Sequence, residues 1–191
     1  MCGRFSLDLP SSKNSFKKET IENYKDIFLF SNFNIAPTDW SPIIIKELNN
    51  YVFRISRWGF EFDWLPKGKT LFNIRTETVF EKSFSKDLIT SNRCLIPFNH
   101  YFEWKKEEDD KKIKYKLHNS EELSFFGGVY QNIGDTLTFS LLTKVSDRIT
   151  GFIHQRNPII IAKKNIKKWF SPDFASYFSN PEVSLAYDED S

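Results

Sequence analysis

Apolar residues recur at helical spacing in three stretches of the chain. Within residues 12–28 they lie three and four positions apart among Lys, Glu and Asn, which predicts an amphipathic surface helix. A second helix is expected to begin at Thr78, which forms a capping box with the acid three residues later, and to end at Asn92. A short third helix around Ile166 is expected to stop at Pro172.

The apolar pattern elsewhere is that of short strands. Runs 43–48 and 51–55 flank Asn49-Asn50, a pair that tolerates the positive φ of a tight turn, so they predict a hairpin. Further β-rich runs are separated by charged or Gly-containing turns and cover residues 71–74, 93–96, 101–105, 113–118, 124–131, 136–143 and 158–162. The centre of the chain is therefore expected to be mostly antiparallel β structure.

Two charged segments are interpreted as solvated. Residues 105–116 balance six Lys against four acids, which is typical of the tip of a hairpin. The acidic residues 188–190 are expected to form a frayed tail.

Composition favours one compact domain over residues 1–191. Apolar residues at 40% and aromatic residues at 17% are enough for a sizeable core. The longest apolar runs are four residues, far short of a transmembrane helix, and the first twenty residues lack the apolar segment of a secretory signal. We therefore expect a cytoplasmic protein, associated with the nucleoid if it is bacterial. A net charge of +2 means that any site for a polyanion must be local.

The two cysteines call for separate explanations. Cys2 and Cys94 belong to no C-x-x-C pair, which disfavours a disulfide framework or a zinc site. Cys94 precedes an apolar run and is expected to be a buried core thiol.

Cys2 follows the initiator methionine, which is generally removed before so small a residue. As the mature N-terminus it would combine an α-amine of pKa about 8 with a thiol of pKa about 8.5. An aldehyde condenses with such an amine to an imine, and the thiol then closes a five-membered thiazolidine. The alternative is an incidental small residue in a mobile terminus.

Five blocks of sequence carry a resemblance to a known family. They are MCGRF (1–5), NIAPT (34–38), NIRTET (73–78), RCLIPFNHYFEWKK (93–106) and the segment from LLTKVSD to IHQRNPIII (141–161). In these blocks the chain resembles the SOS-response-associated peptidase (SRAP) family. The resemblance implies an α+β fold: a single β-rich domain, mostly antiparallel, with a partly barrel-like core and a few flanking helices.

The resemblance also implies an activity. Members of the family bind abasic sites in single-stranded DNA, crosslink to them through the N-terminal cysteine and are described as processing their own initiator methionine. Carried over by motif, the active residues are Cys2, Asn73, Glu103 and His154. No metal and no organic cofactor is implied, and the expected partner is single-stranded DNA containing abasic sites, bound by a monomer away from any membrane.

Each of these residues has a plausible chemical task. His154, which titrates near neutral pH, can protonate the ring oxygen that closes an abasic sugar. Glu103 lies between aromatic residues on an expected strand, where partial desolvation raises a carboxyl pKa toward the range useful for proton transfer. Asn73 can hold the terminal amine or carbonyl of Cys2. A structural hydrogen-bonding histidine, an outward-facing strand carboxylate and a turn asparagine are the alternatives.

DNA contacts are expected from four further residues. Arg4 and Arg75 offer planar donors for phosphate, Thr143 a hydroxyl near the same phosphates, and Trp64 a ring that stacks on a base. Surface arginines and core packing of the tryptophan are the competing interpretations. The lysines in residues 163–168 either extend this track or form a solvated helix face.

One position departs from the family pattern. Asn157 replaces the methionine that usually follows the Arg of the family's His-x-Arg-Met-Pro segment, which puts the packing beside His154 in question. Two rival functions also remain: a peptidase that uses Cys2 as an N-terminal nucleophile, and a non-enzymatic reader of modified DNA.

Overall fold

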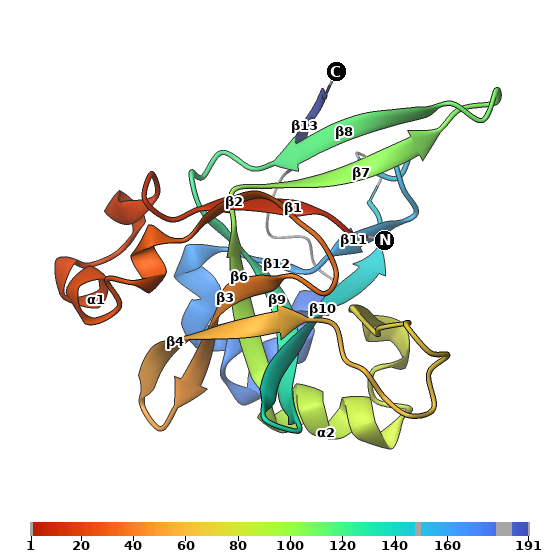
Figure 1. Ribbon diagram of the computed structural model, residues 1–191. Coiled ribbons are helices and arrows are strands. Elements are labelled where there is room, and N and C mark those ends of the chain that lie inside the picture. Colours follow the sequence, from red (N-terminus) through yellow and green to blue (C-terminus); the bar gives the residue numbers. More distant parts are fainter. Residues whose placement is uncertain (1, 148–149, 179–184, 191) are drawn as a thin grey trace.

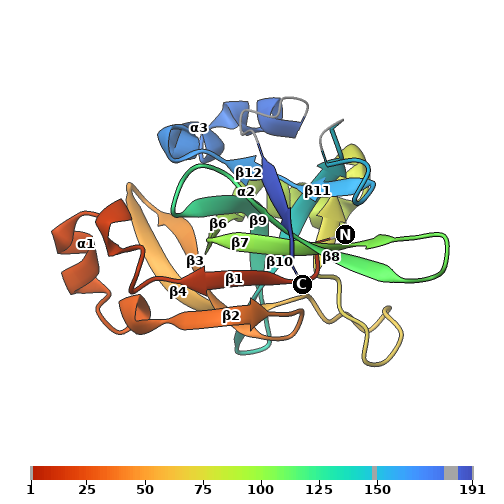
Figure 2. The ribbon, with the colours of Figure 1, turned by 90° about the horizontal axis from the view of Figure 1, so that it is seen from above.

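Two β-sheets form the frame of the structure, a computed structural model that describes residues 2–147, 150–178 and 185–190 (Figures 1 and 2). The smaller sheet has the order β13-β8-β7-β1-β2. Its strands are β1 (Phe5–Asp8), β2 (Ser31–Ile35), β7 (His100–Lys106), β8 (Lys112–His118) and β13 (Ala186–Glu189).

The larger sheet closes into a ring. Its order is β11-β10-β4-β3-β6-β9-β12, and an additional pairing between β10 and β9 completes the circle β10-β4-β3-β6-β9. Its strands are β3 (Trp40–Glu47), β4 (Asn50–Trp58), β5 (Asn73–Arg75), β6 (Arg93–Phe98), β9 (Ser124–Ile133), β10 (Thr136–Val145), β11 (Arg156–Pro158) and β12 (Ile160–Ile161). The pairings are antiparallel except those of β10 with β4 and β5. The expected mostly antiparallel, partly barrel-like α+β fold is confirmed.

Short helices flank the two sheets. They are η1 (Lys13–Ser15), α1 (Lys18–Asn23), η2 (Ile27–Leu29), η3 (Thr76–Thr78), α2 (Ser83–Ser91), η4 (Lys163–Asn165), α3 (Ile166–Trp169) and η5 (Pro172–Phe178). None of the helices in the described parts of the chain is long and apolar enough to span a membrane.

An aromatic core joins the smaller sheet to the barrel. Phe5 of β1 is fully buried and meets Trp58 and Phe126 edge-on, with ring centroids 5.2 and 5.6 Å apart. Phe98 and Phe126 stack at 3.7 Å on neighbouring barrel strands. Because Phe5 lies three residues after Cys2 in the sequence, this packing also fixes the position of Cys2 in space.

The single helix expected over residues 12–28 is wrong. The segment is divided into η1, α1 and η2. Tyr24 and Phe28 both pack on Phe53 of β4, at centroid distances of 5.2 and 5.5 Å. Aromatic contact with the barrel thus determines the path of this segment more strongly than its helical spacing does.

The second helix begins later than its sequence predicts. α2 starts at Ser83 after Lys82, which makes no side-chain cap, so the capping box at Thr78 is wrong. The Ser85 hydroxyl donates to the carbonyls of Val79 and Lys82 instead, at 2.7 and 3.1 Å. The predicted end at Asn92 is confirmed.

The predicted strands are confirmed, with a shift in one turn. The β3–β4 hairpin turns at Leu48 and Asn49, and Leu48 rather than an asparagine takes a positive φ of 55°. β1 and β2 were not expected. The third helix, α3, ends at Trp169, and the chain continues past Pro172 as η5.

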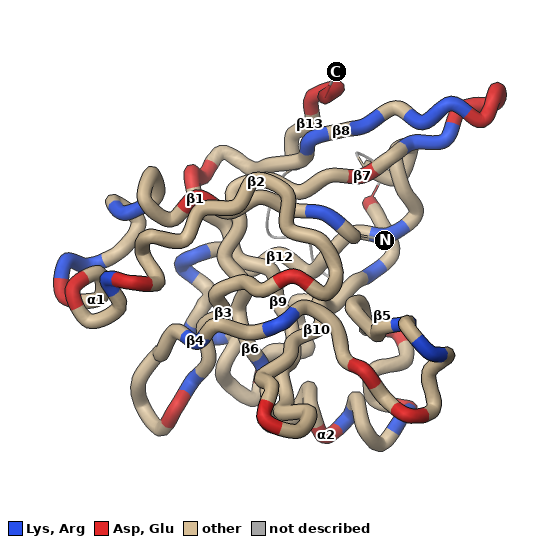
Figure 3. The backbone as a smooth tube through the Cα atoms, viewed as in Figure 1, with Lys and Arg blue, Asp and Glu red and all other residues tan. Residues whose placement is uncertain are grey.

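The acidic C-terminal segment is a strand rather than a frayed tail. β13 pairs antiparallel with the lysine-rich β8, and Figure 3 shows the opposite charges of the two segments. Lys114 pairs with Asp190 at 2.5 Å, and the Tyr115 hydroxyl donates to Glu189 at 3.1 Å. Cross-strand charge complementarity orders these residues.

Gly128 provides a test of the barrel packing. A Cβ at this position would lie 2.6 Å from the Ile96 side chain and 2.7 Å from the Ser140 carbonyl oxygen. Because the latter is backbone, we expect Gly128→Ala to lower the free energy of unfolding by about 1–3 kcal/mol, measured by denaturant titration. The exposed Asn132→Ala on the same strand is the control, and equal stability of the two variants would contradict this packing.

Candidate active site

Cys2 lies inside the molecule with its side chain fully buried. The antiparallel pairing of β1 with β7 continues beyond β1, because the Phe102 N–H donates to the Arg4 carbonyl at 2.9 Å. The Asn73 side-chain amide donates to the Cys2 carbonyl at 2.7 Å. The interior position argues against a mobile, incidental terminal residue.

Asn73 also has a side-chain oxygen that takes no part in the contact with Cys2. Its side chain is buried at the start of β5, and its carbonyl oxygen has no hydrogen-bond partner among the described residues. In the described sheets β5 pairs with no strand other than β10, where Asn73 lies opposite Leu141. The amide therefore orients Cys2 through its nitrogen and offers an acceptor through its oxygen.

Glu103 of β7 places a buried carboxyl near Cys2. Its side chain is only 4% exposed, and burial raises the pKa of its carboxyl to about 7. Glu103 also influences Cys2: burial raises the pKa of the Cys2 thiol well above its ordinary value, and the Glu103 charge raises it further. The desolvated carboxyl expected from the sequence is present, beside a thiol that stays protonated at neutral pH.

Tyr101 is a member of this cluster that sequence reasoning missed. Its hydroxyl is buried without a hydrogen-bond partner in the described structure. Burial raises its pKa well above the ordinary range, and the charges of Cys2 and Glu103 add to the rise. A position two residues from Glu103 on a strand shares its face, and that spacing was the available signal.

His154 lies just before β11, and Figures 1 and 2 show the start of the chain beside that strand. His154 Nδ1 lies 3.0 Å from the Arg156 backbone nitrogen and 3.3 Å from the Arg156 carbonyl oxygen, so it accepts from the N–H in one tautomer and donates to the carbonyl in the other. Burial lowers the pKa of the half-buried imidazole. The lowered pKa favours the neutral ring, in which either nitrogen can carry the proton.

Arg156 and Glu77 form a second feature that the sequence analysis missed. The guanidinium of Arg156 contacts both carboxylate oxygens of Glu77, at 3.1 and 2.8 Å. Burial opposes ionisation of Glu77, but the contacts to Arg156 dominate and lower its pKa. This pair joins β11 to η3 and holds the backbone that positions His154.

A groove of about 440 Å³ opens beside Asn73. Arg75 and Trp64, both exposed, line it together with Asn73, and Trp64 stacks on Phe62 with ring centroids 5.1 Å apart. The structure therefore excludes core packing for Trp64. Lys82 also lines the groove and is a cation that the sequence analysis did not single out.

Two expected DNA-contacting residues have other partners. Thr143 is fully buried; its hydroxyl donates to the Ile74 carbonyl at 3.4 Å and accepts from Arg156 at 3.3 Å, so the expected phosphate contact is replaced by a structural one. Arg4 donates to the Asn34 side chain at 3.0 Å.

Asn157 is accommodated without a methionine. It is buried, its amide donates to the Thr150 hydroxyl, and its carbonyl oxygen accepts from Ser146 at 3.1 Å. The polar side chain is thus satisfied beside His154. Cys94 is buried in the core as predicted.

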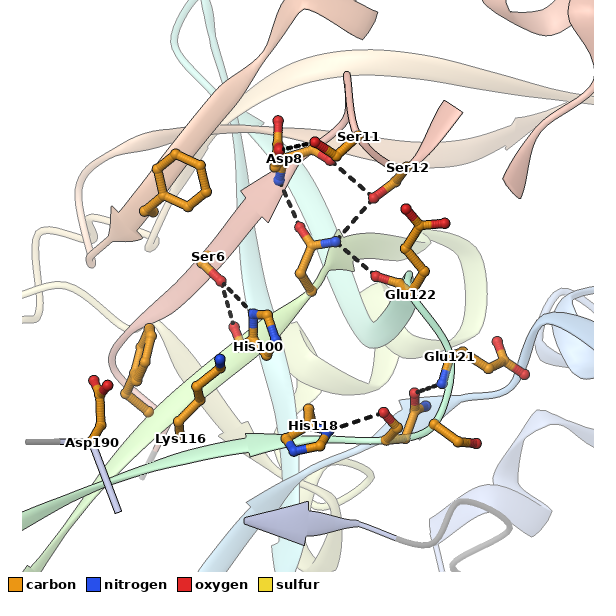
Figure 4. Close-up of a pocket in the computed structure, with 15 residues that line it drawn as sticks. Ser6, Asp8, Ser11, Ser12, His100, Lys116, His118, Glu121, Glu122 and Asp190 are labelled. Atoms are coloured by element: carbon orange, nitrogen blue, oxygen red, sulfur yellow. Dashed lines mark hydrogen bonds between the residues drawn. The ribbon is translucent and has the colours of Figure 1, made fainter. Parts of the chain in front are cut away.

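Another cavity lies elsewhere, on the outer face of the smaller sheet (Figure 4). It measures about 730 Å³, and its lining mixes His100, His118 and Lys116 with acids such as Asp8 and Asp190. His118 contacts Asp188, and His100 contacts Ser6. In the parts of the chain that the structure describes, no cluster of three or more His, Cys, Asp or Glu side chains could hold a metal ion.

Fold and site together define a class: α+β proteins with a buried cysteine near the N-terminus, held by an amide and accompanied by a carboxyl of raised pKa. A sequence profile of the SOS response associated peptidase (SRAP) family matches residues 1–186. The chain belongs to this family.

Characterised relatives and a solved structure are consistent with this assignment. The chain is 32% identical to abasic site processing protein YoqW of Bacillus subtilis, over 90% of this chain and 81% of the relative. It is 29% identical to abasic site processing protein YoaM of the same organism, over 100% and 88%. A crystal structure of a Bacteroides thetaiotaomicron protein shares the fold, with a TM-score of 0.78 at 23% identity and coverage of 97% and 90%.

The raised pKa of Glu103 predicts a pH-dependent stability. The folded protein binds this proton more tightly than the unfolded chain, so stability falls as pH rises from about 4.5 to about 7, by about 3 kcal/mol for this group. Glu103→Gln should remove that loss, and its stability advantage over the wild type should grow across this window. Thermal melts at pH 4.5 and 7.5 measure the difference, with the exposed Glu108→Gln as control; a constant difference would contradict the assignment.

Proposed function

We propose that this protein captures abasic sites in single-stranded DNA by forming a thiazolidine on Cys2 after Met1 is removed. The observation that carries the proposal is the hydrogen bond from Asn73 to the Cys2 carbonyl, next to a carboxyl with a pKa of about 7. Family membership and the names of the relatives, abasic site processing proteins, support the same substrate.

The amine acts first in the proposed sequence. The buried thiol has a raised pKa and enters as S–H, whereas a free α-amine is partly unprotonated near pH 8. The amine nitrogen adds to the aldehyde carbon, and water leaves to give an imine. The sulfur then adds to the same carbon while its proton passes to the nitrogen. Aldehyde and cysteine thus become thiazolidine and one water, and no redox partner or metal takes part in the balance.

Proton transfers in this sequence have nearby groups to perform them. The abasic sugar exists mainly as a closed hemiacetal, and the Nε2–H of His154 is the proposed donor to its ring oxygen. Glu103, half-ionised near pH 7, takes a proton from the amine and returns it to the departing hydroxyl. The free acceptor of Asn73 is available to hold the amine or a sugar hydroxyl.

The groove beside Asn73 suits a single strand. Arg75 and Lys82 provide charge for phosphates, and the exposed Trp64 ring provides a surface for a base next to the lesion. The reacting sugar must leave its stack to reach a buried cysteine, and a duplex resists that deformation. Single-stranded DNA is therefore the proposed substrate form.

A labelled abasic oligonucleotide tests the crosslink directly. Wild-type protein should give a heat-stable adduct in denaturing electrophoresis, and mass spectrometry of the protein should show loss of Met1. Cys2→Ala should give no stable adduct, because an imine without the thiol reverses on denaturation; borohydride should trap part of it. Cys94→Ala is the matched control for loss of a buried thiol. A stable adduct of Cys2→Ala without reductant would refute the mechanism, and binding without any adduct would identify a reader.

Glu103 predicts the pH dependence of the reaction. Its carboxylate is the base, so the single-turnover crosslinking rate should rise with pH through an inflection near 7. Glu103→Gln should abolish this inflection and slow crosslinking by a factor of about 10² to 10⁴, with little change in affinity for a non-reactive abasic analogue. Equal losses of rate and affinity would assign Glu103 a structural role instead.

A further inference from the structure

A basic cavity of about 640 Å³ lies between the η1–α1 segment and the η4–α3 segment. The two segments are tied together by Lys163, whose ammonium donates to the Ser15 carbonyl. In Figures 1 and 2, α1 lies on the opposite side of the molecule from the end of the chain marked N. This cavity shares no lining residue with the groove at Asn73.

Positive charge lines the cavity from both segments, and its lining contains no acidic residue. Four lysines line it, Lys17, Lys163, Lys164 and Lys167, and all are exposed. No salt bridge between described residues uses any of the four. This differs from the larger cavity of Figure 4, where four acids accompany Lys116 and the two histidines. The charge favours an anionic ligand.

The remaining lining is aromatic. Phe16 and Phe53 meet edge-on at 5.7 Å in its floor, and Phe125 adds a third ring. Tyr51 is 40% exposed, and its ring contacts that of Phe170 at a centroid distance of 5.4 Å. An aromatic ring fixed beside several cations suits a ligand that has both a phosphate and a flat base.

We propose that this cavity is a second, non-covalent binding site for single-stranded nucleic acid, in which the lysines contact phosphates and Tyr51 stacks on a base. An acidic peptide would satisfy the charges but has no flat ring for Tyr51, so the aromatic lining favours nucleic acid. The inference is independent of the Cys2 chemistry, because it requires neither an aldehyde nor an abasic site. Two sites on one small protein raise the effective concentration of a bound strand at each of them.

The test uses an intact fluorescent dT oligonucleotide, which cannot crosslink. Lys164→Glu/Lys167→Glu should lower affinity at least tenfold and reduce the salt slope by about 1.4, because each phosphate contact to a single strand contributes about 0.7. Lys111→Glu/Lys112→Glu, at the β7–β8 hairpin, makes the same change of net charge away from the cavity and should have little effect. Tyr51→Ala should lower affinity about fivefold or more.

Several outcomes would overturn the proposal. Equal losses in the two double variants would show only a net-charge effect. An unchanged affinity of Tyr51→Ala would reduce the site to a polyanion patch, and displacement of the oligonucleotide by polyglutamate at equal charge concentration would favour an acidic peptide. Crosslinking of a short abasic oligonucleotide at saturating protein should be unchanged in Lys164→Glu/Lys167→Glu, so failure of this proposal and failure of the Cys2 mechanism give different results.

Discussion

The arrangement of the site depends on burying the first residues of the chain between two sheets. Phe5 packs on Trp58 and Phe126, and this contact pins β1 to the barrel three residues after Cys2. Pairing of β1 with β7 then places Cys2 near Glu103, and Asn73 of β5 donates a hydrogen bond to the Cys2 carbonyl. If the aromatic anchor were absent, the cysteine would be an ordinary flexible end, and the carboxyl of Glu103 would lose the desolvation that raises its pKa.

Burial of Cys2 between the two sheets also limits which compounds can react with its thiol. A buried thiol of raised pKa is a poor target for oxidants and for stray electrophiles, since the thiolate is the reactive form. An N-terminal amine is therefore the group that begins the proposed reaction, and the thiol follows only when the carbon is already attached. In the proposed mechanism, reaction thus requires a ligand that bears an aldehyde and fits the groove.

Sequence alone predicted strands β3 to β10 and the desolvated carboxyl, but it failed where tertiary contacts outweigh local pattern. Alternation of apolar residues is a local property, so β6 to β10 could be found from it. The helix over 12–28 failed because Tyr24 and Phe28 follow the surface of β4, and the C-terminal strand failed because its partner, lysine-rich β8, is about seventy residues away. Tyr101 could have been found from its two-residue spacing to Glu103 on one strand, whereas no spacing rule connects Arg156 with Glu77.

The connection between β5 and β10 has a consequence for synthesis of the protein. β5 has no strand partner other than β10 in the described sheets, so Asn73 reaches its place only after residue 145 has left the ribosome. Until then the nascent chain lacks the hydrogen bond from Asn73 to the Cys2 carbonyl, so removal of Met1, which the proposed mechanism requires, would meet an open terminus. In the proposed scheme, late folding of the barrel leaves time for removal of Met1, and a sequence change that hastened closure would compete with it.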